Sequence, residues 1–356
     1  MKTVSYKIEL DNPNHIFVIA EAGSNWKIGS FNKNLRQAKK LIDIAKECGV
    51  DAVKFQTFRT GSVYVPHAGN SNYLTSYGIR KSINKIFENA EMPYDMLEEL
   101  AEYCKKKNIE FMSTAFSVAD AREVNKYVKI HKVASYEINH IRLLEYLAKT
   151  KKPVILSTGA SNYEEIDFAV NFLKRHGVKE YALLQCTAKY PTPLESLNLL
   201  AIPEMKKRYN IPVGLSDHSL DPIIGPLTAI GLGARIIEKH FTLNRNLSGP
   251  DHKFALIPIE LKKMVQSIRM AEKTLGDGKK RVLSVEKNLR NFAMRRIQTT
   301  SDIKRGERFV EGKNIAILRP GKRKKGADAR FLSIINGKKS KKSIKIGDGV
   351  RLQDSI

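Results

Sequence analysis

The chain has 356 residues, 42% of them hydrophobic, which fits one barrel-sized domain of about 250 residues plus a small domain better than three equal domains. No run reaches the roughly 18 uninterrupted apolar residues of a membrane span, and the N-terminus lacks the apolar core of a signal peptide. The three cysteines are widely spaced and indicate no disulfide framework. We therefore expect a cytoplasmic protein without membrane contact. The formal net charge is +25, which favours anionic ligands or partners.

Short β-rich runs recur through the first 240 residues, with helical patterns between them. The eight runs are Ile16–Ala20, Asp51–Phe55, Ile109–Ser113, Val128–Ala134, Pro153–Leu156, Tyr181–Gln185, Ile211–Leu215 and Ala234–Ile237. Strand–helix alternation through eight units predicts a closed parallel (β/α)8 TIM barrel. A doubly wound open sheet is the alternative, although such a sheet rarely needs eight units without a nucleotide-binding loop.

The connecting helices carry recognisable signals. Apolar residues at the helical period occur over 35–45 and again over 261–271, and the first of these patterns ends at Gly49. Ser161 and Glu164 form the Ser-x-x-Glu spacing of a capping box, which predicts a helix start before the apolar pattern that follows.

A long segment from Thr60 to Met92 separates the second and third predicted strands. It carries the polar and aromatic residues Tyr64, His67, Asn70, Asn72 and Tyr73. Connections of this length in a compact domain are usually functional, so we predict a lid over the barrel mouth.

The pattern changes near residue 280, so we predict a barrel domain over 1–280 and a small β-rich domain over 281–356. Residues 303–307 (IKRGE) and 344–348 (IKIGD) form a weak repeat, which indicates two related halves. Between Lys279 and Ile356, 23 basic residues face 7 acidic ones, an excess of 16 positive charges. No recognition helix or aromatic stacking pattern accompanies this charge, so nucleic acid is not the expected partner and a solvated surface is favoured.

Polar residues gather at the C-terminal ends of the predicted strands, where barrel enzymes carry their reactive groups. In strand order they are Glu21; Lys54 and Gln56; Ser113 and Thr114; Lys132, Ser135 and Glu137; Ser157 and Thr158; Cys186, Thr187 and Tyr190; Ser216, Asp217 and His218; and Glu238, Lys239 and His240. Each has an ordinary structural explanation, but packing alone does not require the whole set at one mouth.

The residues of this set suggest two kinds of site, one for a divalent metal and one for an anionic ligand. His218 and His240 follow adjacent strands and could share a divalent metal, Mn²⁺ or Mg²⁺, with Glu21 and Asp251 in support and no thiolate nearby. Two hydrogen-bonded structural histidines are the alternative. A ring of cations and hydroxyls suits a small ligand that carries both a phosphate and a carboxylate; it consists of Lys54, Lys132, Ser135, Ser157 and Ser216.

Several of these residues stand in longer runs that resemble the sialic acid synthase family. The runs are AEAGSN at 20–25, VKFQ at 53–56, KVAS at 132–135, LSTG at 156–159, CTAKYP at 186–191, GLSDH at 214–218, EKHFTL at 238–243 and GPDH at 249–252. The match runs through most of the chain in the family's order. The tail, with Arg319-Pro320-Gly321, resembles the antifreeze-like (SAF) domain that follows the barrel in that family.

The resemblance implies condensation of phosphoenolpyruvate with a mannosamine-type sugar. His218 and His240 would hold the metal, and the cationic and hydroxyl ring would grip phosphoenolpyruvate. Four residues would contact the sugar, the metal's waters or the transferring protons; these are Glu21, Glu137, Tyr190 and Asp251. Arg319 would reach across a domain-swapped homodimer to the sugar's N-acyl group. Trp26 replaces the family's usual histidine and either stacks on the sugar or packs in the core.

Two other functions remain open at the level of sequence. One is another keto-acid sugar synthase that uses phosphoenolpyruvate, against which the antifreeze-like tail argues. The other is a basic binding protein with an inactive barrel, against which the presence of Lys132, His218 and His240 argues. The acceptor is open among N-acetylmannosamine, a diacetamido-trideoxy sugar and a non-amino hexose.

Overall fold

A computed structural model describes residues 10, 12, 14–70 and 80–356 of the chain. Eight parallel strands form one closed barrel in chain order, because β1 pairs with both β2 and β8. They are β1 (Phe17–Gly23), β2 (Ala52–Thr57), β3 (Glu110–Ala115), β4 (His131–Val133), β5 (Val154–Ser157), β6 (Tyr181–Cys186), β7 (Val213–Asp217) and β8 (Ile236–His240). The predicted barrel is confirmed, and the open-sheet alternative is wrong because an open sheet would leave its edge strands unpaired.

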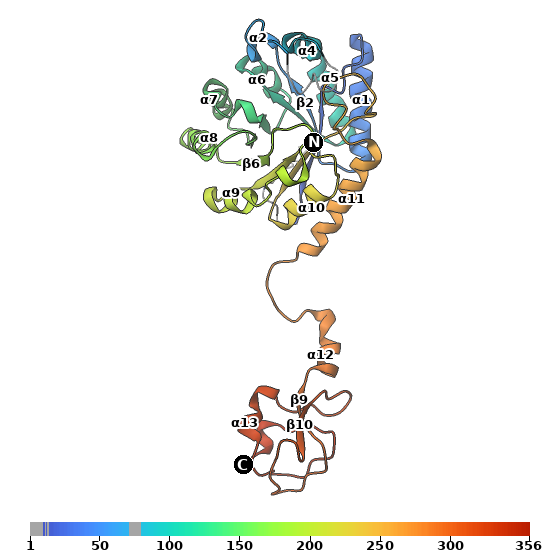
Figure 1. Cartoon of the computed structure of the whole chain (residues 1–356), viewed down its shortest axis with the longest axis vertical. Coiled ribbons are helices and arrows are strands. Elements are labelled where there is room, and N and C mark those ends of the chain that lie inside the picture. Colours follow the sequence, from blue (N-terminus) through green and yellow to red (C-terminus); the bar gives the residue numbers. More distant parts are fainter. Residues whose placement is uncertain (1–9, 11, 13, 71–79) are drawn as a thin grey trace, which may run out of the picture. The chain divides into compact units, whose positions relative to one another are not determined.

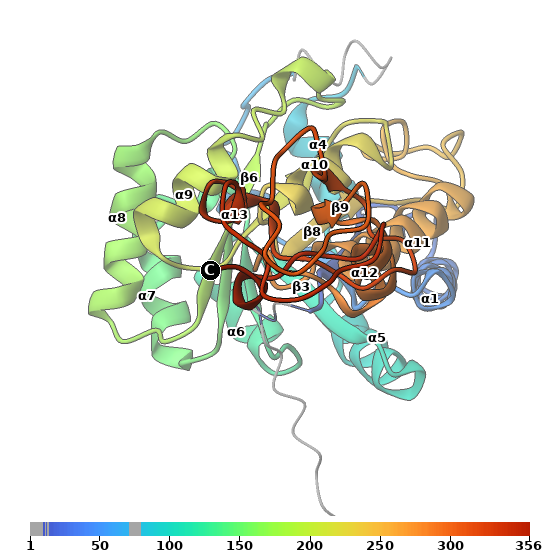
Figure 2. The ribbon, with the colours of Figure 1, turned by 90° about the horizontal axis from the view of Figure 1, so that it is seen from below.

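Helices surround the strands, with α1, α5 and α11 on one side and α7, α8 and α9 on the other in both views (Figures 1 and 2). The barrel unit contains α1 (Phe31–Cys48), α2 (Thr60–Val63), α4 (Ile83–Ala90), α5 (Tyr94–Lys107), α6 (Val118–Asn125), α7 (Ile141–Thr150), α8 (Tyr163–Arg175), α9 (Ala201–Tyr209), α10 (Ile224–Gly231) and α11 (Pro258–Leu275), with the 3-10 turns η1 (Ser135–Glu137) and η2 (Leu194–Ser196). None of the described helices is long and apolar enough to cross a membrane.

The helix signals hold for α1 and α11 but are misplaced by one residue at α8. The start of α8 is capped by Asn162, whose Oδ1 accepts the Glu165 N–H at 3.0 Å while Glu165 Oε2 accepts the Asn162 N–H at 2.8 Å. The predicted Ser161–Glu164 box is therefore wrong. Ser161 instead closes the preceding turn by donating its N–H to the Thr158 carbonyl at 3.2 Å.

Inward-facing side chains fill the lower part of the barrel with apolar groups. They are Phe17, Ile19, Ala52, Met112, Ile130, Ile155, Ala182, Leu184 and Ile236, together with Leu10. On β7 the inward position is Gly214, where an added Cβ would lie 2.3 Å from the Ile236 carbonyl oxygen, so only glycine fits. Because strand side chains alternate, residues two positions after this apolar layer point into the barrel mouth.

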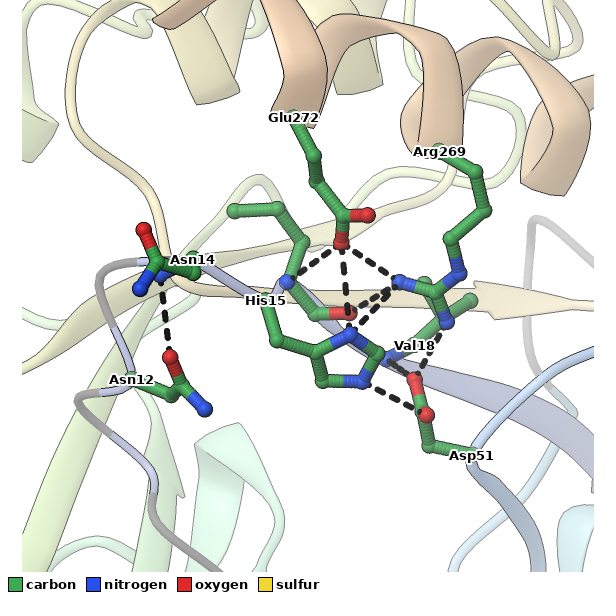
Figure 3. Close-up of polar contacts among 8 residues, drawn as sticks. Asn12, Asn14, His15, Val18, Asp51, Arg269 and Glu272 are labelled. Carbon is green, nitrogen blue, oxygen red and sulfur yellow. Dashed lines mark hydrogen bonds and ion pairs between the residues drawn. The ribbon is translucent and has the colours of Figure 1, made fainter. Parts of the chain in front are cut away.

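At the base of the barrel, a polar network joins the first strand to α11 (Figure 3). Asp51 Oδ2 accepts the Val18 N–H at 2.8 Å and Arg269 Nη2 at 2.7 Å, and its Oδ1 lies 2.7 Å from His15 Nε2. Glu272 Oε1 accepts Arg269 Nη1 at 2.6 Å. Burial alone would raise the pKa of Asp51, but the His15 hydrogen bond and the Arg269 charge hold it below its usual value.

The chain divides into two compact units, Met1–Gly276 and Asp277–Ile356. The second unit contains η3 (Ser284–Glu286), α12 (Lys287–Ala293), β9 (Arg296–Thr299), β10 (Ile315–Leu318), η4 (Ala329–Phe331), α13 (Leu332–Ile335) and η5 (Leu352–Asp354). β9 and β10 form an antiparallel pair beside a small core of Ile297, Ile303, Phe309, Ile315, Ile335, Ile344 and Val350.

The weak repeat in this unit is a real structural correspondence. Ile303 and Ile344 pair with each other, each donating its N–H to the other's carbonyl at 2.9 Å. Gly306 and Gly347 occupy matching turns with φ of 85° and 82°, a region in which glycine avoids a Cβ clash. The two related halves predicted from sequence are therefore confirmed.

Replacing Asp51 with Asn should destabilise the barrel by about 2 kcal/mol at neutral pH, because it removes charge-assisted hydrogen bonds that join three chain segments. The advantage of the wild type should shrink as pH falls through the lowered pKa of Asp51, since the carboxylate is then protonated in both states. The free energy of unfolding of both proteins can be measured by urea unfolding, followed by the fluorescence of Trp26. This residue is the chain's single tryptophan and lies in the core of the barrel.

The matched control is Asp167→Asn, which removes an acidic partner of Arg208 at the exposed surface between α8 and α9. Exposed pairs contribute little, so this variant should unfold nearly as the wild type does. Equal stability losses in the two variants would contradict a special role for the Asp51 network.

Candidate active site

A cavity of about 630 Å³ opens at the C-terminal ends of the barrel strands. Eleven of the twelve residues predicted for the site line it, namely Glu21, Lys54, Lys132, Ser135, Glu137, Ser157, Tyr190, Ser216, His218, His240 and Asp251. The twelfth, Arg319, is an exposed residue of the second unit, and its role stays a prediction.

Strand register explains why residues far apart in sequence share this cavity. Glu21 on β1 pairs in register with Lys54 on β2 and with His240 on β8. Ser216 on β7 pairs with Glu238 on β8, and its hydroxyl lies 3.2 Å from Glu238 Oε1. Because neighbouring parallel strands place such partners at the same height, the cavity floor is a ring of polar side chains.

Two lysines and two glutamates form a buried chain of alternating charge across the floor. Lys54 Nζ forms an ion pair with Glu21 Oε2 and lies 3.7 Å from Glu238 Oε2. Lys132 Nζ lies 3.7 Å from the other oxygen of Glu238. All four side chains are nearly or fully buried, so each charge depends on its partners for compensation.

The pKa values in this chain follow from burial and neighbouring charge. Burial raises the pKa of Glu21 to about 7 against the opposing pull of Lys54. Burial would also raise that of Glu238, but Lys132 and Lys54 bring it below its usual value. Burial lowers the pKa of Lys132, whereas Glu21 and Glu238 outweigh burial at Lys54 and raise its pKa.

Both ammonium groups also contact hydroxyls. Lys132 Nζ donates to Ser157 Oγ at 2.6 Å, and Lys54 Nζ donates to Thr114 Oγ1 at 3.0 Å. Glu238 was not singled out as a site residue from the sequence, although it contacts both lysines. The signal that identifies it is its spacing of two from His240, which places both side chains on the same face of β8.

The two histidines lie side by side, with ring centroids 5.5 Å apart. His218 Nδ1 lies 3.0 Å from the Thr187 carbonyl oxygen, so a proton on Nδ1 leaves Nε2 as the ligand nitrogen. Within the described part of the chain, His240 Nδ1 is buried without a hydrogen-bond partner. Burial takes the pKa of His240 well below its usual value, which keeps the imidazole neutral as a metal ligand requires.

The surroundings of the histidines differ from the prediction in one respect. The thiol of Cys186, at the end of β6, lies 3.8 Å from His218 Nδ1, so a cysteine side chain lies beside the histidines, contrary to the expectation that no thiolate would be near them. No group of three or more His, Cys, Asp or Glu side chains among the described residues is placed to hold a metal by itself. An orphaned imidazole nitrogen beside a second imidazole fits a metal that keeps positions open for water or substrate.

Three further predicted residues line the same cavity as the histidines and the lysines. The Tyr190 ring lies 4.2 Å from the His218 ring. Asp251 Oδ2 accepts both the Ser24 N–H at 3.1 Å and the Ser24 hydroxyl at 2.9 Å. Burial raises the pKa of Glu137 to about 7 against the opposing charge of Lys132.

One side of the cavity is apolar, and we call it the apolar wall: Phe58, Val63, Tyr64, Ile83, Ile86, Phe87, Ala90 and Phe116. Much of it comes from α2 and α4 in the predicted lid segment. The ends of that segment are tied together, because Glu91 Oε1 accepts the Thr60 N–H at 2.7 Å and Arg59 Nη1 donates to the Met92 carbonyl at 3.0 Å. Residues 71–79 of the predicted lid, including Asn72 and Tyr73, lie outside the described residues.

Trp26 does not line this cavity. Its side chain is 1% exposed and belongs to the core between the strands and the outer helices. The stacking role considered for it is therefore wrong, and the packing alternative holds. No local pattern distinguishes this position, because Trp26 lies directly after the AEAGSN run, whose Ser24 does reach the cavity.

Comparison with known proteins now decides the family, because the NeuB family model matches residues 41–280. The chain belongs to the NeuB family. It is 39% identical to the spore coat polysaccharide biosynthesis protein SpsE of Bacillus subtilis over 96% of this chain and 94% of that protein. It is 40% identical to the N,N'-diacetyllegionaminic acid synthase of Campylobacter jejuni over 85% of this chain and 90% of that protein.

A solved structure agrees with these similarities. The N-acetylneuraminic acid synthetase of Leptospira borgpetersenii, determined in complex with citrate, superposes with a TM-score of 0.68 at 34% identity and covers 78% of this chain and 92% of its own. The resemblance to sialic acid synthases seen in the sequence motifs is confirmed at the level of the family. The antifreeze-like nature of the tail stays a prediction.

The raised pKa of Glu137 predicts an unusual pH dependence of stability. A carboxyl whose pKa is about 7 when folded and 4.5 when unfolded stabilises the fold fully below pH 4.5 and progressively less up to pH 7. Glu137→Gln removes this loss, so its stability relative to the wild type should rise by on the order of 1–3 kcal/mol between pH 5 and pH 8. Melting temperatures of both proteins across this range test it.

Glu145→Gln on α7 is the control, because that carboxylate lies at the surface between Lys149 and Arg142. Its melting temperatures should run parallel to those of the wild type. Parallel curves for Glu137→Gln as well would show that the Glu137 carboxyl titrates as an ordinary surface group.

Proposed function

We propose that the protein joins phosphoenolpyruvate to an N-acylmannosamine-type sugar, giving a nonulosonic acid and phosphate. The main support for this proposal is that two buried lysines with hydroxyl neighbours and two adjacent imidazoles share one cavity in a NeuB-family barrel. The similarity to a synthase named for N,N'-diacetyllegionaminic acid, itself a nonulosonic acid, supports this product class.

Phosphoenolpyruvate carries a phosphate and a carboxylate, and the polar floor offers partners for both. Lys54, Lys132 and the hydroxyls of Ser135, Ser157 and Ser216 supply charge-assisted and neutral hydrogen bonds. Glu21 and Glu238 compensate the lysines while no anion is bound. Binding of the donor substitutes one set of negative partners for another, which avoids leaving a buried lysine unpaired.

In the proposed reaction C3 of phosphoenolpyruvate attacks the aldehyde carbon of the open-chain sugar, whose oxygen becomes a hydroxyl. Water adds at C2, and phosphate leaves by C–O cleavage. Glu137 and Glu21 have pKa values of about 7, so each can hold or release a proton at neutral pH. Tyr190, beside the histidines, and Asp251, beside Ser24, orient the sugar.

The metal is part of the proposal. His218 and His240 are the residues that would hold Mn²⁺ or Mg²⁺, and the cation would supply Lewis-acid polarisation of the aldehyde carbonyl. The neutral His240 imidazole and the fixed Nδ1 contact of His218 support this assignment.

The apolar wall supports an acceptor with apolar substituents. An N-acyl methyl group can pack against Phe87 and Ile86, whereas a sugar that bears only hydroxyls would leave that wall facing polar groups. We therefore propose an N-acyl amino sugar, rather than a non-amino hexose, as the acceptor.

Phosphate release from phosphoenolpyruvate tests the reaction and the acceptor together. Release should require a sugar and a divalent metal, and N-acetylmannosamine or its diacetamido-trideoxy analogue should be at least about tenfold better than mannose. His218→Ala should lose more than the 10- to 100-fold that second-shell partners of metal ligands typically cost. His176→Ala, at the exposed end of α8, is the control and should match the wild type.

Two results would overturn the assignment. Full turnover after chelation, or in His218→Ala, would exclude the metal. Phosphate release at the same rate without any sugar would exclude the condensation.

We also propose a two-fold dimer in which the second unit of one subunit completes the barrel of the other. The segment before β9 exposes many large apolar side chains for its length, which supports a protein partner; these are Val282, Leu283, Val285, Leu289, Phe292 and Met294. Arg319 stands at the end of β10 before the Pro320-Gly321 turn, and its planar guanidinium suits the acyl oxygen of the sugar.

A mixing experiment tests this arrangement. His240→Ala and Arg319→Ala subunits should each be nearly inactive, and free exchange should restore about a quarter of the wild-type activity because half of the dimers then hold one intact site. Arg305→Ala, an exposed arginine of the same unit, is the control and should remain active alone. Absence of recovery despite proven exchange, or a fully active monomer, would refute the arrangement.

A further inference from the structure

A buried ion pair lies on the outer face of the barrel, directly behind the two histidines. Asp217 on β7 and Lys239 on β8 are register partners, and Lys239 Nζ donates to Asp217 Oδ2 at 2.6 Å. Their side chains are 0% and 1% exposed. Neither side chain lines the cavity, because alternation along the strands turns them away from it.

Each member of the pair is the chain neighbour of one histidine. Asp217 directly precedes His218, and Lys239 directly precedes His240. The pair also spans the residue after His218, because Lys239 Nζ donates to the Ser219 carbonyl at 2.7 Å and Asp217 Oδ1 accepts the Ser219 N–H at 2.7 Å. The backbone of His218 is therefore held on both sides and joined to the strand that carries His240.

The pair has little freedom to adopt another geometry. An added Cβ at Gly225, in α10, would lie 2.7 Å from Asp217 Oδ2, so the helix backbone presses against the carboxylate. Lys239 makes three polar contacts, the third to Ser219 Oγ at 3.2 Å, which uses all the donors of an ammonium group.

Stability alone does not account for a fully buried ion pair. Removing both charges from water is costly, and apolar side chains of similar volume often stabilise such a position equally well. What a saturated ion pair offers beyond an apolar contact is a fixed relative position of the two backbones, because its hydrogen bonds have a directional optimum.

We propose that the Asp217–Lys239 pair positions His218 and His240 for a shared divalent metal. The inference rests on the metal site of the proposed function and adds to it two positioning residues that touch neither metal nor substrate. The pair fixes where the two strands end relative to each other, and hence the separation of the two imidazoles, which lie 5.5 Å apart between ring centroids.

The test uses the double variant Asp217→Leu/Lys239→Met, which replaces the pair by apolar side chains of similar size and leaves no lone buried charge. Mn²⁺ affinity is measured on the full-length protein by electron paramagnetic resonance without substrates, and phosphoenolpyruvate affinity by calorimetry in chelator. We expect Mn²⁺ binding at least about tenfold weaker, as for other outer partners of metal ligands, with phosphoenolpyruvate affinity unchanged. Asp217→Asn, which keeps the shape of the carboxylate, is the second variant and should weaken Mn²⁺ binding in the same direction.

Thr57→Val is the matched control. The substitution removes a buried contact on the outer face between β2 and β3, where Thr57 Oγ1 lies 2.7 Å from Ser113 Oγ. Like Asp217, Thr57 is the chain neighbour of a residue that lines the cavity, in this case Gln56. It should lower the melting temperature without changing Mn²⁺ affinity.

The outcomes separate the inference from the function on which it rests. Wild-type Mn²⁺ affinity in Asp217→Asn or in the double variant, with only the melting temperature lowered, would overturn the positioning role and leave the metal site standing. Wild-type protein that binds no Mn²⁺, or binding unaffected by His218→Ala, would overturn the proposed metal site and the inference with it.

Discussion

Closure of the barrel, in which β1 pairs with β8, is the constraint on which the rest of this molecule depends. Once the strands form a ring, their side chains alternate between an enclosed interior and a layer covered by helices. The interior is filled by apolar groups in its lower part, and Gly214 admits close contact where a side chain would not fit. The next inward residues share one cavity, although the outermost of them, Glu21 and His240, are more than 200 positions apart in sequence.

That shared cavity changes the energetics of its charges. Lys54, Lys132, Glu21 and Glu238 are buried, and each would be costly alone. Arranged in alternation they compensate one another, while burial raises the pKa values of the Glu21 and Glu137 carboxyls to about 7 against the opposing charges of the lysines. A site with this balance suits an anionic donor and a reaction with proton transfers, because charge can be exchanged without exposing the cavity to water.

The second unit follows a different principle. Its core is small, and its two halves pair with each other through Ile303 and Ile344. Each of these residues is followed by a matching turn, at Gly306 in one half and at Gly347 in the other. A domain of this size has little apolar area to bury on its own. The exposed apolar side chains before β9 and the excess positive charge both fit a unit that packs on another protein surface, as proposed for the dimer.

The sequence by itself determined the eight strand–helix units, the change of pattern near residue 280 and the polar set at the strand ends. These features depend on periodicity and turn residues, which are local. Tertiary structure decided which members of the polar set face the cavity. At the ends of β7 and β8 the residues of both faces are polar, so the hydrophobic pattern does not reveal that Glu238 points inward and Lys239 outward. Closure also brought Cys186 to His218 and buried Trp26, because distances between strands and helices are set by packing across the fold rather than by any local signal.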